Sequence, residues 1–548
     1  MNINELQTPA ILLNLDSMEH NIKKYCDAAA ANQKEIWPMI KTHKSTELAR
    51  IQAEYGCSGF LCGTLDEAEA MAKAGFHSIM YAYPVATEVS IKRVIRLASK
   101  CSLIVRLDGV DAARPLNEAA EKAGVTVNYT IIVDSGLHRF GVAADHVVEL
   151  ADELRTLKNL RFCGISTHPG HVYGASCEAD IEKYCQDEME NIGIAVEHLH
   201  TAGYECDMVS SGSTPTFFGV LKDKNIKIYH PGNYIFNDAI QLSTNTATEE
   251  ECALYVLASV ISHPREDLFI CDAGAKCLGL DQGAHGNSSI QGHGVVKGHP
   301  ELNLYSLSEE VGKIHVHGKT DLKVGDKILI IPNHSCSSAN LTDYYIGVRG
   351  EEVERLIEVD IRGNCTKKGF RSADMIELLK SDAFDEVFEI MKKSFPKDEY
   401  RTYEGQKKLL EEPVYRIYGM RDFESGNIQG FIAVWEFESV VFIEHLAVDP
   451  MIRNAGIGSK ILKELQQKIG KMMCLEVEFP ETELAARRIG FYERNGFFLN
   501  RYPYMQPALA DGQNEVPLLI MTTGKAVDEE GFLKIKELLY RNVYRVRM

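Results

Sequence analysis

The sharpest chemical signal in the chain is a histidine and a cysteine two positions apart, His334 and Cys336, in the segment PNHSC. On an extended segment, side chains two residues apart point to the same side. Imidazole nitrogen and thiolate sulfur are both good ligands for a divalent metal. The spacing therefore predicts a metal pair that leaves positions open for substrate and water. A buried cysteine beside a turn histidine is the non-functional alternative.

A second signal is the basic tetrapeptide KTHK at 41–44, which follows a predicted strand at 35–40. A lysine amine can bind a carbonyl-bearing cofactor covalently, although a solvated loop explains the tetrapeptide equally well. Two further turns, 210–215 and 230–234, are rich in Ser, Gly and Pro and also follow strands. Their hydroxyl and backbone N–H groups suit a phosphate. Lysine and phosphate turns together are what pyridoxal phosphate (PLP) requires.

The bulk properties limit the class of protein. A chain of 548 residues is too long for one core and predicts two or three domains. The net charge of −19 argues against nucleic acid and anionic membranes as partners. The N-terminus lacks the pattern of a secretory signal, and no window is apolar enough to span a membrane. Fourteen scattered cysteines then indicate reduced thiols, so we expect a cytoplasmic protein that acts on small molecules.

The elements that must position these residues change character along the chain. Residues 10–245 alternate short β-branched runs with amphipathic helical stretches such as 64–75, which predicts a parallel α/β barrel; a doubly wound sheet is the second choice. Residues 246–363 read as strands with glycine turns, a β-domain that carries the metal pair. The earliest strand, 11–15, is a candidate to join it. A polar stretch, 364–373, is the predicted linker to a new domain at 374–548.

Eight segments of the first 363 residues match one family: TPAILLNLD at the start, IKTHK (40–44), YAYPV (81–85), VDSGLHRFGV (133–142), GSTPT (212–216), HPGNYIFND (230–238), DAGAKCLGLDQG (272–283) and PNHSCSSANL (332–341). With them this part of the chain resembles the D-serine dehydratase and D-threonine aldolase family of PLP enzymes. The resemblance implies a (β/α)8 barrel like that of alanine racemase, followed by a β-domain. It also implies a homodimer.

The resemblance assigns roles to individual residues. Lys41 is implied to bind PLP covalently and to act as the catalytic base, with Tyr173 as a catalytic residue near the metal. His230 stands where alanine racemases place an arginine under the ring nitrogen. The remaining cofactor contacts implied by the family are Arg139 at the phenolate oxygen, His168 against the ring, and Gly212, Ser213, Thr214, Gly232, Asn233 and Tyr234 at the phosphate.

The metal pair discriminates between reactions within the family. The aldolases typically use His-x-Asp, whose oxygen ligand suits manganese or magnesium, whereas the dehydratases use His-x-Cys, and thiolate favours zinc. His334 and Cys336 therefore favour β-elimination from a D-β-hydroxy-amino acid such as D-serine or D-threonine. The alternatives are aldol cleavage to glycine and an aldehyde, racemisation with a second base, and a non-catalytic PLP-binding module.

The last domain carries a different pattern. Residues 442–462, FIEHLAVDPMIRNAGIGSKIL, read as a strand, a turn and a glycine-rich helix start, where backbone N–H groups can hold a pyrophosphate. With ARRIGFYERNGF at 486–497, this block resembles the acetyl-CoA-binding segment of the GNAT acetyltransferases. The chain is thus an α/β multidomain protein, a PLP barrel with a β-domain followed by an α+β GNAT domain. The last 25 or so residues fit no pattern.

The GNAT resemblance implies a second set of site residues. Tyr492 is implied to protonate the leaving thiolate, and Glu444 is the best-placed general base. An exposed strand glutamate is an equally good interpretation of Glu444, and Glu476 and Glu478 are weaker candidates. The segment at 398–400 is expected to shape the pocket of an unidentified amine. The implied acetyl-CoA contacts are Leu446, Val448, Arg453, Asn454, Ala455, Gly456, Ile457, Gly458 and Ser459.

Overall fold

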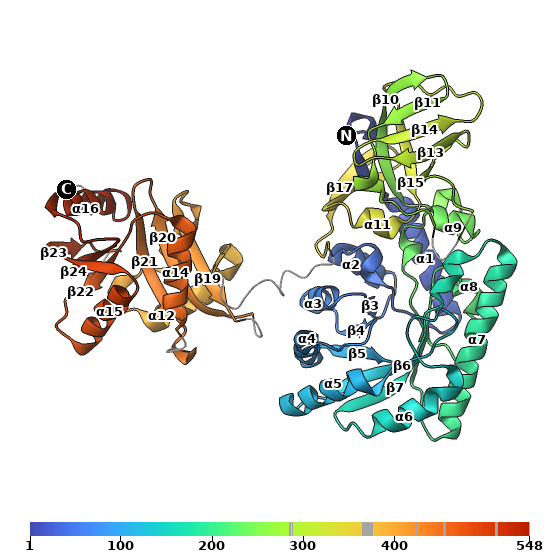
Figure 1. The fold of residues 1–548 in the computed structure, drawn as a ribbon, viewed down its shortest axis with the longest axis horizontal. Helices are drawn as coiled ribbons and strands as arrows, with labels where there is room; N and C mark the ends of the chain where they lie inside the picture. Colours follow the sequence, from blue (N-terminus) through green and yellow to red (C-terminus); the bar gives the residue numbers. More distant parts are fainter. Residues whose placement is uncertain are drawn as a thin grey trace. The chain divides into compact units, whose positions relative to one another are not determined.

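The computed structural model describes residues 1–283, 287, 289–363, 376–422, 426–452, 456–509 and 513–546 (Figure 1). The chain divides into two compact units, Met1–Cys365 and Thr366–Met548, each with its own core. The predicted linker, 364–373, lies outside the described residues. No helix in the described ranges is both long and apolar enough to cross a bilayer.

Eight parallel strands form the centre of the first unit, in the order β2-β9-β8-β7-β6-β5-β4-β3. β2 pairs with β9, and a parallel bridge between Met39 and Leu61 joins the segment after β2 to β3, so the sheet closes into a barrel. This confirms the predicted barrel. The strands are β2 Glu35–Ile36, β3 Phe60–Cys62, β4 Ser78–Tyr81, β5 Ser102–Leu107, β6 Val127–Ile132, β7 Leu160–Ser166, β8 Met208–Ser211 and β9 Ile228–Tyr229.

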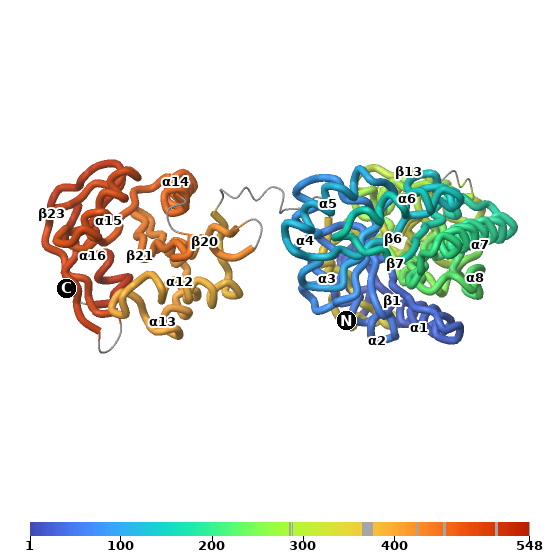
Figure 2. The backbone as a smooth tube through the Cα atoms, turned by 90° about the horizontal axis from the view of Figure 1, so that it is seen from below, coloured from blue at the N-terminus to red at the C-terminus, as the bar shows by residue number. Residues whose placement is uncertain are grey.

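Helices α3 to α7 follow one another around the outside of these strands (Figure 2). Each buries its apolar face against the barrel; in α3 the capping box of Thr64 and Glu67 fixes the start of the helix. The helices of this unit are α1 Leu15–Ala31, α2 Thr46–Glu54, α3 Leu65–Lys73, α4 Glu88–Ala98, α5 Val110–Ala123, α6 Val147–Arg155, α7 Glu178–Thr201, α8 Phe217–Val220, α9 Ala239–Ser243, α10 Ala275–Leu278 and α11 Ser335–Ala339.

A nine-stranded sheet, ordered β11-β14-β13-β12-β15-β10-β1-β16-β17, forms the β-domain. Its first strand, β1, comes from the N-terminus and pairs with both β10 and β16. The strands are β1 Ala10–Asn14, β10 Leu254–Arg265, β11 Leu268–Cys271, β12 Gly294–Val296, β13 Leu302–Leu307, β14 Gly312–Val316, β15 Lys327–Pro332, β16 Tyr344–Arg349 and β17 Glu352–Glu358.

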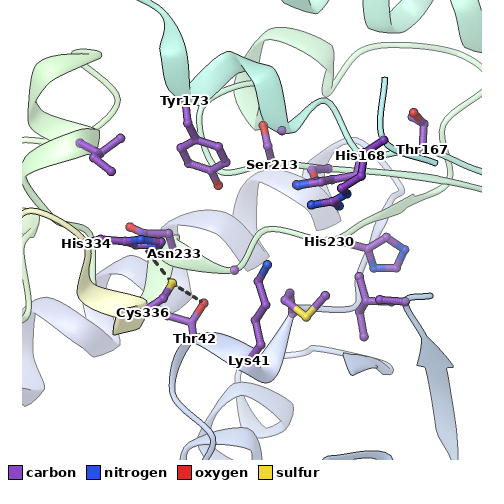
Figure 3. A pocket seen from close by; sticks show the side chains of 18 of the residues that line it. Lys41, Thr42, Thr167, His168, Tyr173, Ser213, His230, Asn233, His334 and Cys336 are labelled. Atoms are coloured by element: carbon purple, nitrogen blue, oxygen red, sulfur yellow. Dashed lines mark hydrogen bonds between the residues drawn. The ribbon is translucent and has the colours of Figure 1, made fainter. Parts of the chain in front are cut away.

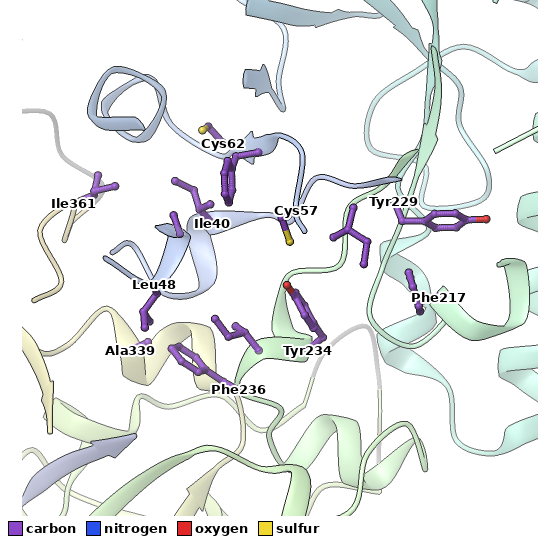
Figure 4. Packing of buried hydrophobic residues seen from close by; sticks show 14 of the residues in the cluster. Ile40, Leu48, Cys57, Cys62, Phe217, Tyr229, Tyr234, Phe236, Ala339 and Ile361 are labelled. Atoms are coloured by element: carbon purple, nitrogen blue, oxygen red, sulfur yellow. The ribbon is translucent and has the colours of Figure 1, made fainter. Parts of the chain in front are cut away.

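One hydrophobic cluster runs from the barrel into the β-domain (Figure 4). Ile40 and Leu48 belong to it on the barrel side, and Ala339 and Ile361 on the β-domain side. Tyr345 donates its hydroxyl hydrogen to the His43 carbonyl over 2.7 Å. The β-domain therefore packs directly against the KTHK turn and fixes its position.

The second unit is a seven-stranded sheet with helices, ordered β18-β19-β20-β21-β22-β24-β23 and parallel only between β21 and β22. Residues 377–378 form an edge strand that pairs with β19, and the following Leu379 packs over Gly419. The elements are β18 Glu377–Leu378, α12 Phe384–Ser394, α13 Tyr403–Lys408, β19 Tyr415–Arg421, β20 Ile428–Glu436, β21 Val441–Val448, α14 Ile457–Ile469, β22 Met473–Glu478, α15 Glu483–Arg494, β23 Phe497–Gln506, β24 Val516–Thr523 and α16 Glu529–Asn542.

Lys44 and Glu67 form an ion pair that is almost completely buried, with side-chain exposures of 5% and 0%. Replacing Glu67 with Gln would leave the Lys44 ammonium buried without a counter-charge. We expect Glu67→Gln to lower the free energy of unfolding by about 3 kcal/mol, measured by urea denaturation. The control is Glu88→Gln, which breaks an exposed pair with Lys92 and is expected to cost less than about 0.5 kcal/mol. Equal losses in both variants would contradict the importance of the buried pair.

Candidate active site

A cavity of about 190 Å³ lies at the carboxyl ends of the barrel strands (Figure 3). This is the end at which barrels of this kind carry their active sites. Residues from the barrel and from the β-domain meet there: Met39, Lys41, Thr42, Leu61, Ala82, Tyr83, Arg106, Arg139, Thr167, His168, Gly170, Tyr173, Gly212, Ser213, His230, Gly232, Asn233, Asp238, Ile240, Gln241, His334 and Cys336.

The structure separates the two lysines of the KTHK turn. Lys44, with a backbone φ of +48°, turns inward to Glu67, whereas Lys41 points into the cavity (Figure 3). Gly63 makes room for Lys41, since a Cβ at this glycine would lie 3.3 Å from the Lys41 Cβ. Only Lys41 is therefore available to a ligand.

Two histidines, the partly buried His168 and the buried His230, form one side of the cavity. His168 Nδ1 lies 2.9 Å from the Gly212 carbonyl, and His230 Nδ1 lies 2.7 Å from the Trp37 carbonyl. Both Nδ1 atoms must donate, because a carbonyl only accepts. Burial, reinforced by the Lys41 charge, lowers the pKa of His168 to about 3, and burial also lowers the pKa of His230. Both rings are therefore neutral, so His230 offers an acceptor at Nε2 and not a cation.

The phosphate turns depend on glycine. Gly212 has a φ of +153°, and a Cβ there would lie 2.5 Å from the His230 nitrogen. A Cβ at Gly232 would lie 3.1 Å from the Thr42 hydroxyl oxygen. Ser213 lies on the cavity wall between them. Side chains are thus excluded where a phosphate would have to approach the backbone.

The structure directs the side chains of two predicted phosphate contacts toward other partners. Tyr234 is fully buried in the hydrophobic core (Figure 4), where its hydroxyl accepts a hydrogen bond from Gln52. Its backbone N–H donates to Thr214 Oγ1 over 3.1 Å, so neither group of Tyr234 is free for a cofactor. Asn233 turns toward the β-domain, with its Nδ2 2.6 Å from Asp238 and 3.7 Å from the Cys336 sulfur. The Thr214 side chain is buried, and its hydroxyl oxygen accepts the hydrogen bond from the Tyr234 backbone.

Sequence reasoning missed Arg106. This arginine extends from β5 into the cavity wall, only 4% exposed, and one of its terminal nitrogens is buried without a hydrogen-bond partner among the described residues. Burial lowers its pKa to about 10. The sequence contained one indication of this role, because Arg106 is a charged residue within the otherwise apolar strand SLIVRL (102–107). Unpaired atoms of Arg106, His230 (Nε2) and Asn233 (Oδ1) indicate a site built for a polar ligand. A lysine, phosphate turns and these groups fit PLP.

The histidine and cysteine of the PNHSC segment lie on the opposite side of Lys41 (Figure 3). The prediction of an extended segment is wrong, because β15 ends at Pro332 and His334 is the N-cap of α11. Both side chains nevertheless line the cavity. The Cys336 thiol donates to Thr42 Oγ1 over 3.3 Å, and His334 Nδ1 lies 3.4 Å from Asp281.

The two side chains of this pair interact electrostatically. Burial opposes ionisation, but the attraction between the two groups raises the pKa of His334 and lowers that of Cys336. Among the described residues, no group of three or more His, Cys, Asp or Glu residues gathers as a metal site. The donor set of imidazole and thiolate, with the Asp281 carboxylate behind the imidazole, fits zinc. Tyr173 points into the cavity between this pair and His168, and burial raises its pKa.

In the second unit, β21 and β22 pair only from Val441 to Ile443 and then separate. Leu446 and Val448 follow the separation and pair only with β20. Gly456, at φ +76°, begins α14, and Gly458 packs against Val448 and Phe491. Of the other predicted acetyl-CoA contacts, Ile457 is buried, the Ser459 hydroxyl is bound by Asn495, and Arg453, Asn454 and Ala455 lie outside the described residues.

Glu444 lies just beyond the last paired residue, and it is neither exposed nor free. Arg401 donates a hydrogen bond to the Glu444 carboxylate over 2.6 Å, and the Glu444 side chain is 5% exposed. Burial alone would raise the pKa of Glu444, but the charge and hydrogen bond of Arg401, together with the neighbouring His445, bring it well below its usual range. An ion-paired carboxylate with a low pKa is a poor general base. Burial raises the pKa of Tyr492 to about 12, which keeps its phenol protonated.

Fold and cavity define an alanine-racemase-like PLP enzyme. The family model "Alanine racemase, N-terminal domain" matches residues 13–239, "Putative serine dehydratase domain" matches 253–348, and "Acetyltransferase (GNAT) domain" matches 415–498. The chain belongs to the D-serine dehydratase and D-threonine aldolase family. It is a PLP-dependent lyase fused to a GNAT acetyltransferase domain.

Several characterised proteins resemble the first unit. The 3-hydroxy-D-aspartate aldolase of Paracoccus denitrificans (strain Pd 1222) is 31% identical, covering 66% of this chain and 94% of its own. The D-serine dehydratase of Dictyostelium discoideum is 30% identical, and the match covers 63% of this chain and 94% of the dehydratase. The solved D-threo-3-hydroxyaspartate dehydratase from Delftia sp. HT23 is 28% identical, with a TM-score of 0.62. The match covers 66% of this chain and 100% of the solved chain.

The glycine at the phosphate turn can be tested directly. We expect Gly212→Ala to lower the free energy of unfolding by about 2 kcal/mol and to reduce the PLP bound per chain, because the new Cβ meets the His230 backbone. Bound PLP is read from its visible absorbance. The control is Gly193→Ala in α7, whose Cβ would meet only Asn225 at 3.9 Å. Full PLP occupancy in Gly212→Ala would contradict this assignment of the phosphate site.

Proposed function

We propose that the first unit catalyses a PLP- and metal-dependent β-elimination on a D-β-hydroxy-amino acid such as D-serine or D-threonine. The observation that carries the proposal is the presence of Lys41, His334 and Cys336 on one cavity. PLP, when bound, supplies an electron sink for the α-carbon. Zinc, when held by His334 and Cys336, supplies a Lewis acid for the β-hydroxyl group.

The residues of the chain then have distinct tasks. The Lys41 amine, from its place between the two sides of the cavity, takes the α-proton. Neutral His168 lines the side opposite the metal pair, and Tyr173 lies near the metal pair. Loss of the hydroxyl group and hydrolysis of the resulting enamine give a 2-oxo acid and ammonia.

Aldol cleavage is the second candidate for the same cavity. The Paracoccus relative at 31% identity is a 3-hydroxy-D-aspartate aldolase, and the Delftia relative is a D-threo-3-hydroxyaspartate dehydratase. One solved mutant of the Delftia enzyme is in the metal-free form, which supports a metal in this group. The thiolate of Cys336 favours zinc and hence elimination. The product distinguishes the reactions: a 2-oxo acid for elimination, glycine for aldol cleavage.

Metal removal tests this function. We expect EDTA to abolish formation of 2-oxo acid from D-serine or D-threonine and added zinc to restore it, because the β-hydroxyl is a poor leaving group without a Lewis acid. Oxo acid, glycine and the L-enantiomer are measured together after incubation. Elimination that persists after EDTA treatment, with no zinc bound, would contradict the proposal. Formation of the L-enantiomer in the presence of EDTA would indicate a racemase. Absorbance of bound PLP without any product from a D-amino acid would indicate a non-catalytic module.

The thiolate can be tested separately. We expect Cys336→Ala to lose bound zinc and at least about 100-fold in elimination rate, since ligand loss weakens both binding and polarisation. Cys336→Asp is expected to respond to manganese better than the wild type, because carboxylate is a harder ligand. Cys177→Ala, at an exposed cysteine at the start of α7, is the control. Zinc content is measured by metal analysis; unchanged zinc in Cys336→Ala would contradict the site.

We also propose that the second unit transfers an acetyl group from acetyl-CoA to an amine. The separation of β21 from β22 and the glycine-started helix α14 support a donor site there. Tyr492 is the proposed acid for the leaving thiolate. A homodimer, implied by the family resemblance, is proposed as the assembly and is measured by light scattering of the purified chain.

A further inference from the structure

A second hollow, of about 240 Å³, lies in the acetyltransferase unit. Three segments far apart in sequence build it: Arg401 to Leu409 around α13, Ala508 and Leu509 after β23, and residues 543–545 after α16. None of these residues lies within 415–498, the range of the GNAT family match. The hollow is therefore a feature of this chain that the family match does not describe.

Two residues on the wall of the hollow contact carboxylates that lie where β21 and β22 separate. Arg401, on its wall, is bound to Glu444, and Tyr544, also on its wall, donates to Glu476 over 2.7 Å. Glu444 and Glu476 each follow the last paired residue of their strand, Ile443 and Leu475. The two carboxylates therefore stand at the strand separation, where the acyl donor is expected.

The two carboxylates differ in whether they can accept a proton from a substrate. Glu444 is neutralised by Arg401. Among the described residues, the hydrogen-bond partners of Glu476 are the hydroxyls of Tyr504 and Tyr544. Burial raises the pKa of Glu476 to about 7, although both hydroxyls lower it. The charged groups near it are Glu444, which raises its pKa, and His445, which lowers it. A carboxyl of this kind can exchange a proton near neutral pH.

The charges on the rim favour an anionic group. Three cationic residues line the hollow, Arg401, Lys408 and Arg545, against one carboxylate, Glu412. Arg401 is paired with Glu444, and Arg545 with Glu412. Within the described residues, the exposed Lys408 forms no ion pair. Its ammonium is thus the group that a carboxylate of a ligand could bind.

We infer that this hollow is the acceptor site of the acetyltransferase and that it takes an amine carrying a carboxylate, a free amino acid, with the carboxylate at Lys408 and the amine toward Glu476. The inference rests on the proposed acetyltransferase function. Free amino acids are also the substrate class proposed for the first unit, so one class of molecule would serve both.

The transfer balances as follows in atoms and protons. The ammonium group gives one proton to Glu476, and the free amine attacks the thioester carbonyl carbon. The C–N bond forms, the C–S bond breaks, and the second amine proton is lost as the thiolate is protonated to the thiol. Glu476 then returns its proton to solvent, so one proton is released for each amide formed.

The acceptor class is tested with the full chain carrying Lys41→Ala, so that the first unit does not consume the amino acids. D- and L-serine are compared with ethanolamine and serinamide, which lack the carboxylate, and release of CoA thiol is measured. We expect kcat/KM for at least one serine enantiomer to exceed that for ethanolamine by about tenfold or more. Equal or better use of the carboxylate-free amines would overturn the inference and leave the acetyltransferase function standing. No acetylation of these amines or of a wider amine panel would contradict the acetyltransferase function itself.

Variants test the two residues. Lys408→Ala is expected to raise KM for the amino acid about tenfold and to change KM for ethanolamine much less, because ethanolamine has no carboxylate that would lose its partner. The control is Lys407→Ala, whose neighbouring ammonium binds the Tyr403 hydroxyl outside the hollow. An unchanged KM in Lys408→Ala would overturn the carboxylate site.

Glu476→Gln is expected to lower kcat about 100-fold without changing the Kd of acetyl-CoA measured by calorimetry. Wild-type kcat should fall as the pH drops below about 7, because protonated Glu476 cannot accept the amine proton, and the Gln variant should lack this inflection. Full activity of Glu476→Gln with an unchanged pH profile would overturn the role of Glu476.

Discussion

The carboxylate of Glu67 accepts hydrogen bonds from both sides of the seam at which the barrel closes. On one side it binds the backbone N–H groups of Gly63 and Thr64, at 2.6 and 3.3 Å, and on the other the ammonium of Lys44. Lys44 is thereby held inside the structure, and the 3-10 turn Ile40–Thr42 that follows β2 leaves Lys41 directed into the cavity. Within the described residues, Lys41 is the lysine that lines the cavity, whereas the neighbouring Lys44 is withdrawn into its ion pair with Glu67. Because both charges are out of water, the pair stabilises the fold only when it is complete.

The same turn is held from the β-domain. Tyr345 binds the His43 carbonyl, and the Ile361 N–H donates to the Lys44 carbonyl over 3.0 Å. Asp238 ties the start of α11 to the phosphate turn by accepting from the Ser335 N–H at 2.9 Å. His334 and Cys336 therefore meet Lys41 across an interface between two sheets, and neither sheet contains the whole cavity. This explains why the barrel and the β-domain share one hydrophobic cluster: the site requires that they do not move independently.

The acetyltransferase unit places two buried glutamates, Glu444 and Glu476, next to each other. Its parallel strands separate next to two glutamates, and placing both as free anions in a buried position would be costly. One, Glu444, is paired with Arg401, whereas Glu476 is held by tyrosine hydroxyls and has a raised pKa. Tyr544, which follows α16, is one of these partners, so the C-terminal segment that matches no family pattern contributes to the chemistry of the sheet.

The sequence by itself determined the alternation of strands and helices that gives the barrel, because hydrophobic periodicity is a local property, and the resemblance of its motifs indicated the two kinds of unit. It also singled out Lys41, His334 and Cys336, whose residue types limit the possible chemistry. It could not place Tyr234 in the core, add Arg106 to the cavity, or show that Glu444 is bound by Arg401. Those outcomes depend on contacts between residues up to hundreds of positions apart. The direction of a side chain, and the charge it carries, are set by partners that only the tertiary structure brings within a few ångströms.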